Sequence, residues 1–395
     1  MQMQWEAPLY PMQRDNPLHP PSSYRDLREH GPVVDARMRD TGKKVWLVTR
    51  YQEAMQVLLD PRFSSDCTRS GFPVKRTPSA LIRMDPPDHT KYRRMLSGEF
   101  TIRRMSELEP KIQDLTDRLI DDMVSSGPTA DLVHALARPL PSLVICHLLG
   151  VPDEDHEFLQ DETTKALRTD ATDEEISAAV NNLGAYMQGV VSEKLGRTDD
   201  DLLCRLLNKY HASGECSLET AADLARLLLV AGHVTTVNMI GIGLLTLLKN
   251  PDQLTALRSD LEGIPGAVEE LLRFLSITAT LARVASTDLE IGGTTIKAGD
   301  GVLILLSSAN RDRLVFERPD TFELTRETSQ HLAFGWGPHI CLGAPLARLE
   351  LQVVFSTLLR RFPTIELDID FSRIPFREKV LIYGVQSLPI RWSYG

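Results

Sequence analysis

The chain has 395 residues, a formal net charge of −10, 42% hydrophobic residues and 25% charged residues. This composition is ordinary for a globular protein, and the acidic balance argues against nucleic-acid binding. Five cysteines without a CxxC pair suggest neither a disulfide framework nor a zinc site, and they favour a reducing cytoplasm. The polar, proline-rich N-terminal residues contain neither an apolar signal sequence nor a membrane anchor.

The first predicted elements are two strands within residues 33–50, joined by a turn at residues 40–42. From there to about Phe274 the hydrophobic period is mainly helical, with irregular segments at residues 64–87 and 168–175.

The most apolar stretch is residues 224–248. It belongs to one long predicted helix over residues 218–249, which ends before Asn250-Pro251 and lies inside a globular core. Strand-like segments return at residues 289–296, 301–306 and 380–390. We therefore expect a mainly α fold with a small β region (α+β), built from both ends of the chain as a single intertwined domain over residues 1–395.

One cysteine occupies an unusual place in the sequence HLAFGWGPHICLGAPLARLEL, residues 331–351. Glycines surround Cys341 and allow tight turns, and Pro345 suits the first turn of a following helix. A thiolate just before a helix N-terminus is stabilised by free N–H groups, and it serves as a nucleophile or a metal ligand. For the other cysteines we expect inert, buried thiols: Cys67, Cys146, Cys204 and Cys216.

Four motifs together resemble a known family. Residues 334–343, FGWGPHICLG, resemble the haem-binding loop of the cytochrome P450 superfamily. Residues 268–274 resemble its Glu-x-x-Arg helix, residues 231–236 its oxygen-binding helix bend, and residues 85–93 its haem-propionate helix. The motifs follow the family order. The sequence as a whole most resembles the soluble bacterial members that oxidise secondary metabolites.

The resemblance implies a P450 fold that binds haem b (iron protoporphyrin IX), with Cys341 as the iron ligand. Thiolate ligation supplies an electron-rich axial ligand. The other cofactor-binding residues that the resemblance implies are His89, Arg93, Arg283, Phe334, Gly335, His339 and Gly343. Of these, the two histidines and the two arginines would bind the haem propionates, and Phe334 would shield the sulfur from water.

Glu270 and Arg273 are spaced i, i+3 and share one helix face, so their side chains can pair. The simplest interpretation is an exposed pair of little energetic weight. The resemblance instead implies a buried structural network with a later arginine, such as Arg326.

The predicted oxygen-binding bend departs from the family pattern. Ala231 and Gly232 leave space for O2, and the hydroxyl groups of Thr235 and Thr236 are present, but Val234 replaces the usual acid. The missing acid leaves three explanations open. Protons arrive by another route, or the enzyme is an NADH-dependent nitric oxide reductase, or the protein binds haem without catalysis. His233 is a candidate proton donor, although packing or solvent exposure is the more ordinary role.

By resemblance, the chain is a monooxygenase that uses O2 to hydroxylate or epoxidise a medium-to-large hydrophobic molecule, such as a macrolide or another polyketide. The expected pocket residues are Phe72, Leu81, Ile82, Leu228, Ile277, Leu281 and Ile382. No second cysteine cluster supplies an iron–sulfur centre, so a ferredoxin and its reductase are expected as electron donors. Candidate docking residues are Lys91, Arg94, Arg103, Arg104 and Arg348. We expect a monomer.

Overall fold

The computed structural model describes residues 6–74, 80–168, 170–327, 330–377 and 382–393. The chain divides into two compact units, and each unit combines segments that are distant in the sequence. Unit 1 comprises residues 1–90 and 269–341, and unit 2 comprises residues 91–268 and 342–395. The predicted single domain over the whole chain stays a prediction, whereas the mainly α fold with small sheets is confirmed.

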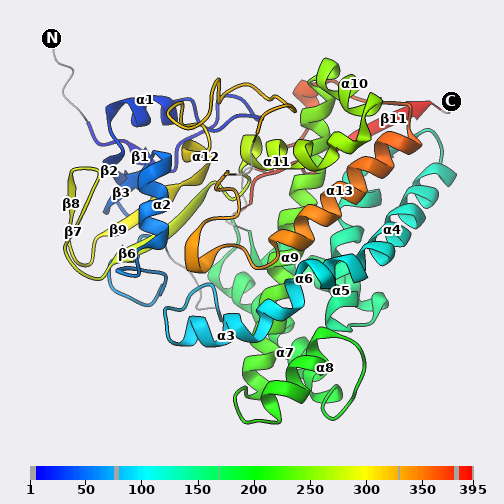
Figure 1. Cartoon of the computed structure of the whole chain (residues 1–395), viewed down its shortest axis with the longest axis horizontal. Helices are drawn as coiled ribbons and strands as arrows, with labels where there is room; N and C mark the ends of the chain where they lie inside the picture. Colours follow the sequence, from blue (N-terminus) through cyan, green and yellow to red (C-terminus); the bar gives the residue numbers. More distant parts are fainter. Residues whose placement is uncertain (1–5, 75–79, 169, 328–329, 378–381, 394–395) are drawn as a thin grey trace. The chain divides into compact units, whose positions relative to one another are not determined.

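Unit 1 is built on a six-stranded sheet with the order β1-β2-β3-β9-β6-β4 (Figure 1). Its strands are β1 (Leu9–Tyr10), β2 (Val33–Met38), β3 (Lys44–Val48), β4 (Phe63–Ser64), β6 (Thr280–Ala285) and β9 (Gly301–Leu305). The unit also contains α1 (Ser23–His30), α2 (Tyr51–Leu59), the hairpin β7 (Leu289–Ile291) and β8 (Thr294–Ile296), and α12 (Leu306–Ala309). The predicted hairpin within residues 33–50 is confirmed, since β2 and β3 pair antiparallel.

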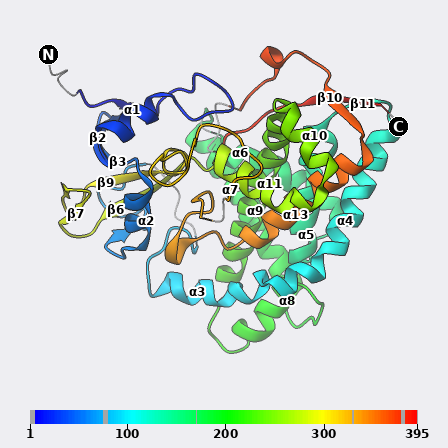
Figure 2. The same cartoon turned by 45° about the horizontal axis from the view of Figure 1, so that its top comes forward.

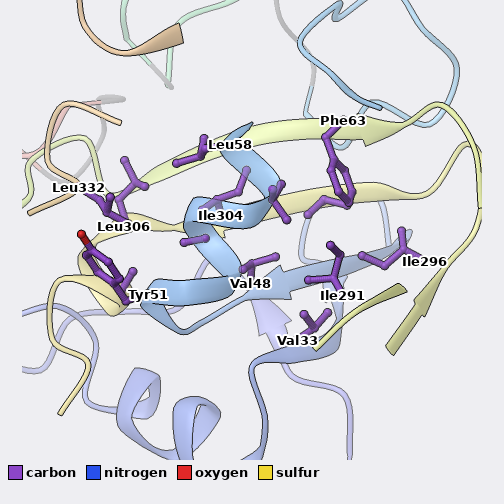
Figure 3. Packing of buried hydrophobic residues seen from close by; sticks show 14 of the residues in the cluster. Val33, Val48, Tyr51, Leu58, Phe63, Ile291, Ile296, Ile304, Leu306 and Leu332 are labelled. Carbon is purple, nitrogen blue, oxygen red and sulfur yellow. The ribbon is translucent and has the colours of Figure 1, made fainter. Parts of the chain in front are cut away.

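Apolar side chains from α2 and the sheet form one core of unit 1 (Figure 3). Leu58 of α2 packs with Val48 of β3, Ile304 of β9 and Phe63 of β4, and all four are buried. Burial of each such side chain contributes roughly 1.5–3 kcal/mol. The same cluster includes Leu332. The core therefore holds the chain immediately before residues 334–341, which we call the cysteine segment.

Unit 2 is mainly helical (Figure 2). Its longer helices are α4 (Ile102–Ser125), α5 (Pro139–Leu149), α6 (His156–Ala166), α7 (Asp173–Glu193), α9 (Leu218–Leu248), α10 (Pro251–Ser259) and α13 (Ala344–Arg361). Its shorter helical segments are η1 (Gly98–Phe100), η2 (Val133–Ala137), η3 (Asp153–Asp155), α8 (Leu202–Leu206), η4 (Leu207–His211), η5 (Leu261–Gly263) and η7 (Phe371–Arg373). Helices α3 (Asp88–Ser97) and α11 (Ile264–Leu275) continue from one unit into the other along the chain, and η6 (Gly337–His339) belongs to unit 1.

Helix α9 is the central helix of unit 2 and packs against α5, α7 and α13. Ser217 caps its N-terminus through a 3.0 Å hydrogen bond from the Thr220 amide, and Lys249 caps the other end just before Asn250-Pro251. The helix is long and apolar enough to span a membrane, but 78% of its most apolar window is buried inside the protein. The predicted long core helix is therefore confirmed.

The three-stranded sheet of unit 2 has the order β10-β11-β5. Its strands are β5 (Thr129–Asp131), β10 (Thr364–Leu367) and β11 (Pro389–Ser393). The strand expected at residues 380–390 is wrong in its start, because residues 382–388 are irregular apart from an isolated bridge between Val385 and Phe376, and residues 378–381 lie outside the described residues. The Arg377 amide donates to the Gly384 carbonyl at 2.8 Å, so residue 384 pairs with residue 377 rather than with a strand of the sheet.

Candidate active site

The cysteine segment is a turn closed by backbone hydrogen bonds. The Cys341 amide donates to the Phe334 carbonyl at 2.9 Å, and the Ile340 amide donates to the Gly337 carbonyl at 3.0 Å. Gly343 is the N-cap of α13, with Pro345 in the first turn, as the sequence predicts. The Cys341 side chain is exposed at the end of this turn.

The other cysteines differ from Cys341 in exposure and acidity. Cys146, Cys204 and Cys216 are buried, and burial raises the pKa of each thiol, for Cys146 to about 12. These three are inert thiols at neutral pH. Cys67 is only partly buried, so the expectation of four buried cysteines is wrong for that residue.

Two glycines of the cysteine segment have backbone angles that other residues rarely adopt, with φ of +72° at Gly335 and +71° at Gly337. A Cβ atom on Gly337 would lie 2.8 Å from the Leu58 carbonyl oxygen. A Cβ atom on Gly335 would lie 3.5 Å from Leu281 Cδ1. Conformation and contact together require glycine at position 337.

A cluster of basic side chains gathers in unit 1. The His89 and His339 rings stack with centroids 3.9 Å apart, and His339 Nε2 lies 3.3 Å from Ser65 Oγ. The Ser65 amide donates to Asp85 Oδ1 at 2.8 Å. The carboxylate of Asp85 in turn acts on the guanidinium of Arg283.

Arg283 on β6 is buried, and Nη1 donates to the neighbouring Ala282 carbonyl at 2.8 Å. Burial, followed by the charge of Arg83, lowers its pKa to about 10. A buried guanidinium is costly without an anionic partner. Its position therefore suits a carboxylate ligand such as a haem propionate.

The remaining predicted haem contacts lie on neighbouring parts of the chain. Arg93 is half-buried on α3, and Gly343 begins α13. The half-buried Phe334 ring lies 6.0 Å from the His331 ring, between centroids. With an exposed thiol just before a helix, and with the buried Arg283 guanidinium and two stacked histidines in unit 1, the residues present fit a haem with two propionates.

Glu270 and Arg273 form a fully buried bidentate ion pair, with Nε–Oε2 at 2.7 Å and Nη2–Oε1 at 2.8 Å. Arg326 Nε adds a further contact to Glu270 Oε1 at 3.3 Å. Arg273 also donates to the carbonyl oxygens of Asn310, Pro319 and Thr321. The pair thus holds the segment of residues 310–326 against α11, and the interpretation as an exposed pair does not apply.

The predicted oxygen-binding face lies in the middle of α9. Ala231 is exposed, and Gly232 and Thr235 are partly exposed, on a helix that is otherwise mostly buried. Thr235 Oγ1 donates to the Ala231 carbonyl at 2.8 Å, which places a second donor on that carbonyl. Small residues and a turned-back hydroxyl leave the helix open where a ligand would approach. Thr236 is instead buried, with its hydroxyl on the Gly232 carbonyl at 3.2 Å.

His233 and Val234 are both buried in unit 2. Burial, then the charges of Arg138, Arg377 and His156, lowers the pKa of His233 to about 3. His233 is therefore neutral at physiological pH. Packing is the role that the structure gives its ring, rather than exposure to solvent.

The predicted pocket residues differ in exposure. In unit 1, Leu81 and Ile277 are buried, Phe72 and Leu281 are partly buried, and Ile82 is 46% exposed. Leu281 lies next to Gly335 of the cysteine segment. In unit 2, Leu228 is buried on α9, and the Ile382 carbonyl accepts from Asn238 Nδ2 at 3.5 Å.

Sequence reasoning missed Glu350, which lies on α13 and is 2% exposed. Among the described residues, its Oε2 atom has no hydrogen-bond partner, and burial raises the pKa of the carboxyl to about 8. Helix α13 packs against α9, so a protonated acid lies in the helical core of unit 2. The only sequence signal is an acid in an apolar helical stretch directly after the cysteine segment.

Comparisons with known proteins identify the family. Residues 170–382 match the family model described as Cytochrome P450. The chain is 46% identical to Cytochrome P450-SU2 of Streptomyces griseolus over 95% of this chain and 94% of that protein. It is 42% identical to Pentalenic acid synthase of Streptomyces avermitilis over 98% of both chains.

A solved structure supports the same family assignment. The crystal structure of CYP105P1 in complex with filipin I matches with a TM-score of 0.94 and 37% identity, over 99% of this chain and all of that one. The chain belongs to the cytochrome P450 family and is a haem-thiolate monooxygenase of the bacterial type.

Proposed function

We propose that the enzyme inserts one oxygen atom into a C–H or C=C bond of a medium-to-large hydrophobic secondary metabolite, a macrolide or another polyketide. The exposed Cys341 thiol in its glycine-constrained turn carries the proposal, together with family membership. Filipin I, which is bound in the crystal structure of CYP105P1, supports this substrate class.

The residues of the chain would have the following roles in binding and catalysis. Cys341 would ligate the iron, and His89, Arg93, Arg283 and His339 would hold the propionates. When bound, the haem supplies the activation of O2. Thr235 orients water and moves protons at its Oγ1, and Ala231 with Gly232 leaves space for O2.

Protons need a route that does not use residue 234. Val234 is buried and cannot carry a proton, and His233 is neutral with a pKa of about 3. We assign proton delivery to ordered water and Thr235. The comparisons do not support the nitric oxide reductase alternative, because the similar proteins are P450 enzymes associated with secondary metabolites.

We further propose that the enzyme is a cytoplasmic monomer and receives electrons from a ferredoxin and its reductase. The docking residues of unit 2 are partly neutralised, since Arg94 pairs with Glu215 and both Arg103 and Arg104 pair with Glu107. Lys91 forms no ion pair among the described residues, so we assign it a larger share of the proposed steering than Arg94, Arg103 or Arg104.

A spin-state titration tests the proposed function. Macrolides, other polyketides, steroids and fatty acids are added to the ferric protein, and the Soret band is followed. We expect a polyketide to shift the band to the high-spin position and to yield an oxygenated product with ferredoxin and reductase. A Soret shift without any oxygenated product would contradict the monooxygenase assignment, and a response restricted to steroids would contradict the substrate class.

A further inference from the structure

A buried histidine of unit 1 lies at the start of the chain that leads to Cys341. The side chain of His331 is only 2% exposed. Its Nε2 atom lies 3.1 Å from Oε2 of Glu269 on α11, and its Nδ1 atom accepts a hydrogen bond from the Ala333 amide at 3.1 Å. Both ring nitrogens are therefore committed, one to a carboxylate and the other to the backbone two residues further along the chain.

These two contacts specify the tautomer of the His331 ring. Nδ1 faces an N–H donor, so it must offer a lone pair, and the hydrogen of the ring then lies on Nε2. An ionised carboxylate has only acceptor atoms, so Glu269 binds the ring through that Nε2 hydrogen. Glu269 therefore favours the tautomer that can accept the Ala333 amide.

The neighbouring acid of α11 has different partners. Glu270 is bound by Arg273 at 2.7 and 2.8 Å and by Arg326 at 3.3 Å. The two successive carboxylates of α11 thus hold two different segments of unit 1, and only Glu269 acts on the chain next to the cysteine segment.

The residue that follows His331 is fixed independently of the histidine ring. Leu332 is fully buried in the apolar core of unit 1 (Figure 3). Its amide donates to Asn310 Oδ1 at 2.7 Å, and its carbonyl accepts the Gly335 amide at 2.9 Å. The chain at residue 332 therefore keeps its anchors when the ring is removed, and the effect of removal falls on the residues that follow.

Those residues connect the ring to the thiol. Among the described residues, the Ala333 amide donates only to His331 Nδ1. The carbonyl of the next residue, Phe334, accepts the Cys341 amide at 2.9 Å, and the Phe334 ring lies 6.0 Å from the His331 ring, between centroids. His331 thus holds the chain one residue before the carbonyl that accepts the Cys341 amide.

We propose that Glu269 and His331 are positioning residues for the Cys341 thiolate. Glu269 sets the tautomer of the ring, the ring holds the Ala333 amide, and the adjoining Phe334 carbonyl holds the Cys341 amide. Groups that lie behind a metal ligand orient it and tune the affinity for the metal. The proposal rests on Cys341 as the iron ligand of the proposed function, and it assigns a role to two residues outside the proposed haem-binding set.

The first test uses the haem-loaded protein and side chains that replace one ring nitrogen at a time. His331→Ala should lower the share of the ferrous carbonyl complex with the thiolate-type spectrum and should speed haem transfer to apomyoglobin about tenfold. His331→Asn should restore both readouts, because an Asn side chain accepts from the amide two residues further on. His331→Gln reaches towards Glu269 instead and should not restore them.

The second test concerns the tautomer. Glu269→Gln keeps an acceptor oxygen for Nε2 and should behave as wild type, whereas Glu269→Ala should give a loss between those of wild type and His331→Ala. The ferrous carbonyl complex is diamagnetic, so nitrogen NMR of isotopically labelled histidine measures the tautomer. The His331 hydrogen should lie on Nε2 in wild type and in Glu269→Gln, and Glu269→Ala should show a mixture of tautomers.

A histidine–carboxylate pair of unit 2 provides the matched control. His134 Nδ1 lies 2.6 Å from Asp131 Oδ2, but the His134 side chain is 59% exposed. His134→Ala should leave the spectrum and the haem transfer unchanged. Thermal unfolding and circular dichroism establish that each variant folds. If His331→Ala does not fold, His331→Asn against His331→Gln, and Glu269→Gln against Glu269→Ala, decide the outcome.

Several results would overturn the proposal. They are wild-type behaviour of His331→Ala, rescue by His331→Gln, a hydrogen on Nδ1 of the wild-type ring, or equal losses in Glu269→Gln and Glu269→Ala. A similar loss in His134→Ala, or a loss that only follows the unfolding temperature of the variants, would also refute a positioning role. If the wild type lacks the thiolate-type spectrum, the proposed function fails as well; if only the His331 variants fail to change it, the proposed function stands.

Discussion

Arg273 in unit 1 is fully buried, whereas Arg377 in unit 2 is half-buried, and the surroundings of the two side chains also differ. Every nitrogen of the Arg273 guanidinium donates to Glu270 or to a backbone carbonyl. Arg377 has a buried Nε without an acceptor among the described residues. A buried cation whose hydrogen bonds are all made within its own unit has a structural role, and the contrast with Arg377 shows that the role depends on complete satisfaction of the guanidinium.

The largest expected effect concerns the cysteine segment, which belongs to the same unit as Arg273. Cys341→Ala should abolish the thiolate-type spectrum of the ferrous carbonyl complex completely, because no other thiol of the chain lies in this segment. The far-ultraviolet circular dichroism spectrum should be the same as that of the wild type, since an exposed side chain contributes little to packing. Retention of the thiolate spectrum would refute the ligand assignment.

The second prediction tests whether Arg273 has a purely structural role. Glu270→Ala should lower the free energy of unfolding by about 3–5 kcal/mol, because it leaves Arg273 buried without its counter-ion. Urea unfolding measures the loss. Glu317→Ala removes a carboxylate that is 90% exposed and should cost less than about 0.5 kcal/mol. Equal losses in the two variants would contradict the contrast drawn between the arginines.

The third prediction concerns Glu350, whose pKa is raised to about 8 from an ordinary value of 4.5. The folded state binds this proton more tightly than the unfolded state, so its stabilisation is complete below pH 4.5 and is lost as pH rises through 8. Glu350→Gln stays neutral and should be more stable than wild type at pH 9, on the order of 2–4 kcal/mol, with little gain at pH 5. Urea unfolding at both pH values measures this.

Glu366→Gln, on the exposed surface of β10, is the matched control and should show no such pH dependence. An identical response of the two variants between pH 5 and pH 9 would remove the argument that Glu350 is protonated in the fold.

A smaller effect is expected at the open face of α9. Thr235→Ala removes the hydroxyl that bonds the Ala231 carbonyl, and it should divert reductant into hydrogen peroxide about tenfold more than wild type. Product formed per NADH consumed measures the coupling. Thr246→Ala removes a similar back-bonded hydroxyl elsewhere on α9 and should not uncouple the enzyme. Unchanged coupling in Thr235→Ala would mean that protons bypass this residue.

The smallest effect is expected at the proposed docking surface. Lys91→Glu should slow reduction by ferredoxin a few-fold and weaken its dependence on salt, since surface charges act mainly on association rates. Stopped-flow reduction at low and high ionic strength measures both. Arg118→Glu, which reverses an exposed charge on α4, should leave the rate unchanged if the surface is specific.

Much of the fold follows from local sequence patterns. The hairpin of β2 and β3, the length and ends of α9, and the turn before α13 are predictable, because turns, caps and prolines act over a few residues. The late start of β11 is not, since residues 382–388 form contacts with Arg377 and with Asn238 of α9 instead.

The same distinction between local sequence patterns and tertiary structure applies to the candidate site. The sequence by itself determined the cysteine segment, the i, i+3 pairing of Glu270 with Arg273, and the absence of an acid at Val234. Only the tertiary structure decided that Glu350 is buried, that His233 is neutral and that Arg273 is fully satisfied by hydrogen bonds. The physical reason is that burial and charge compensation depend on residues brought together from distant parts of the chain, and no local pattern encodes them.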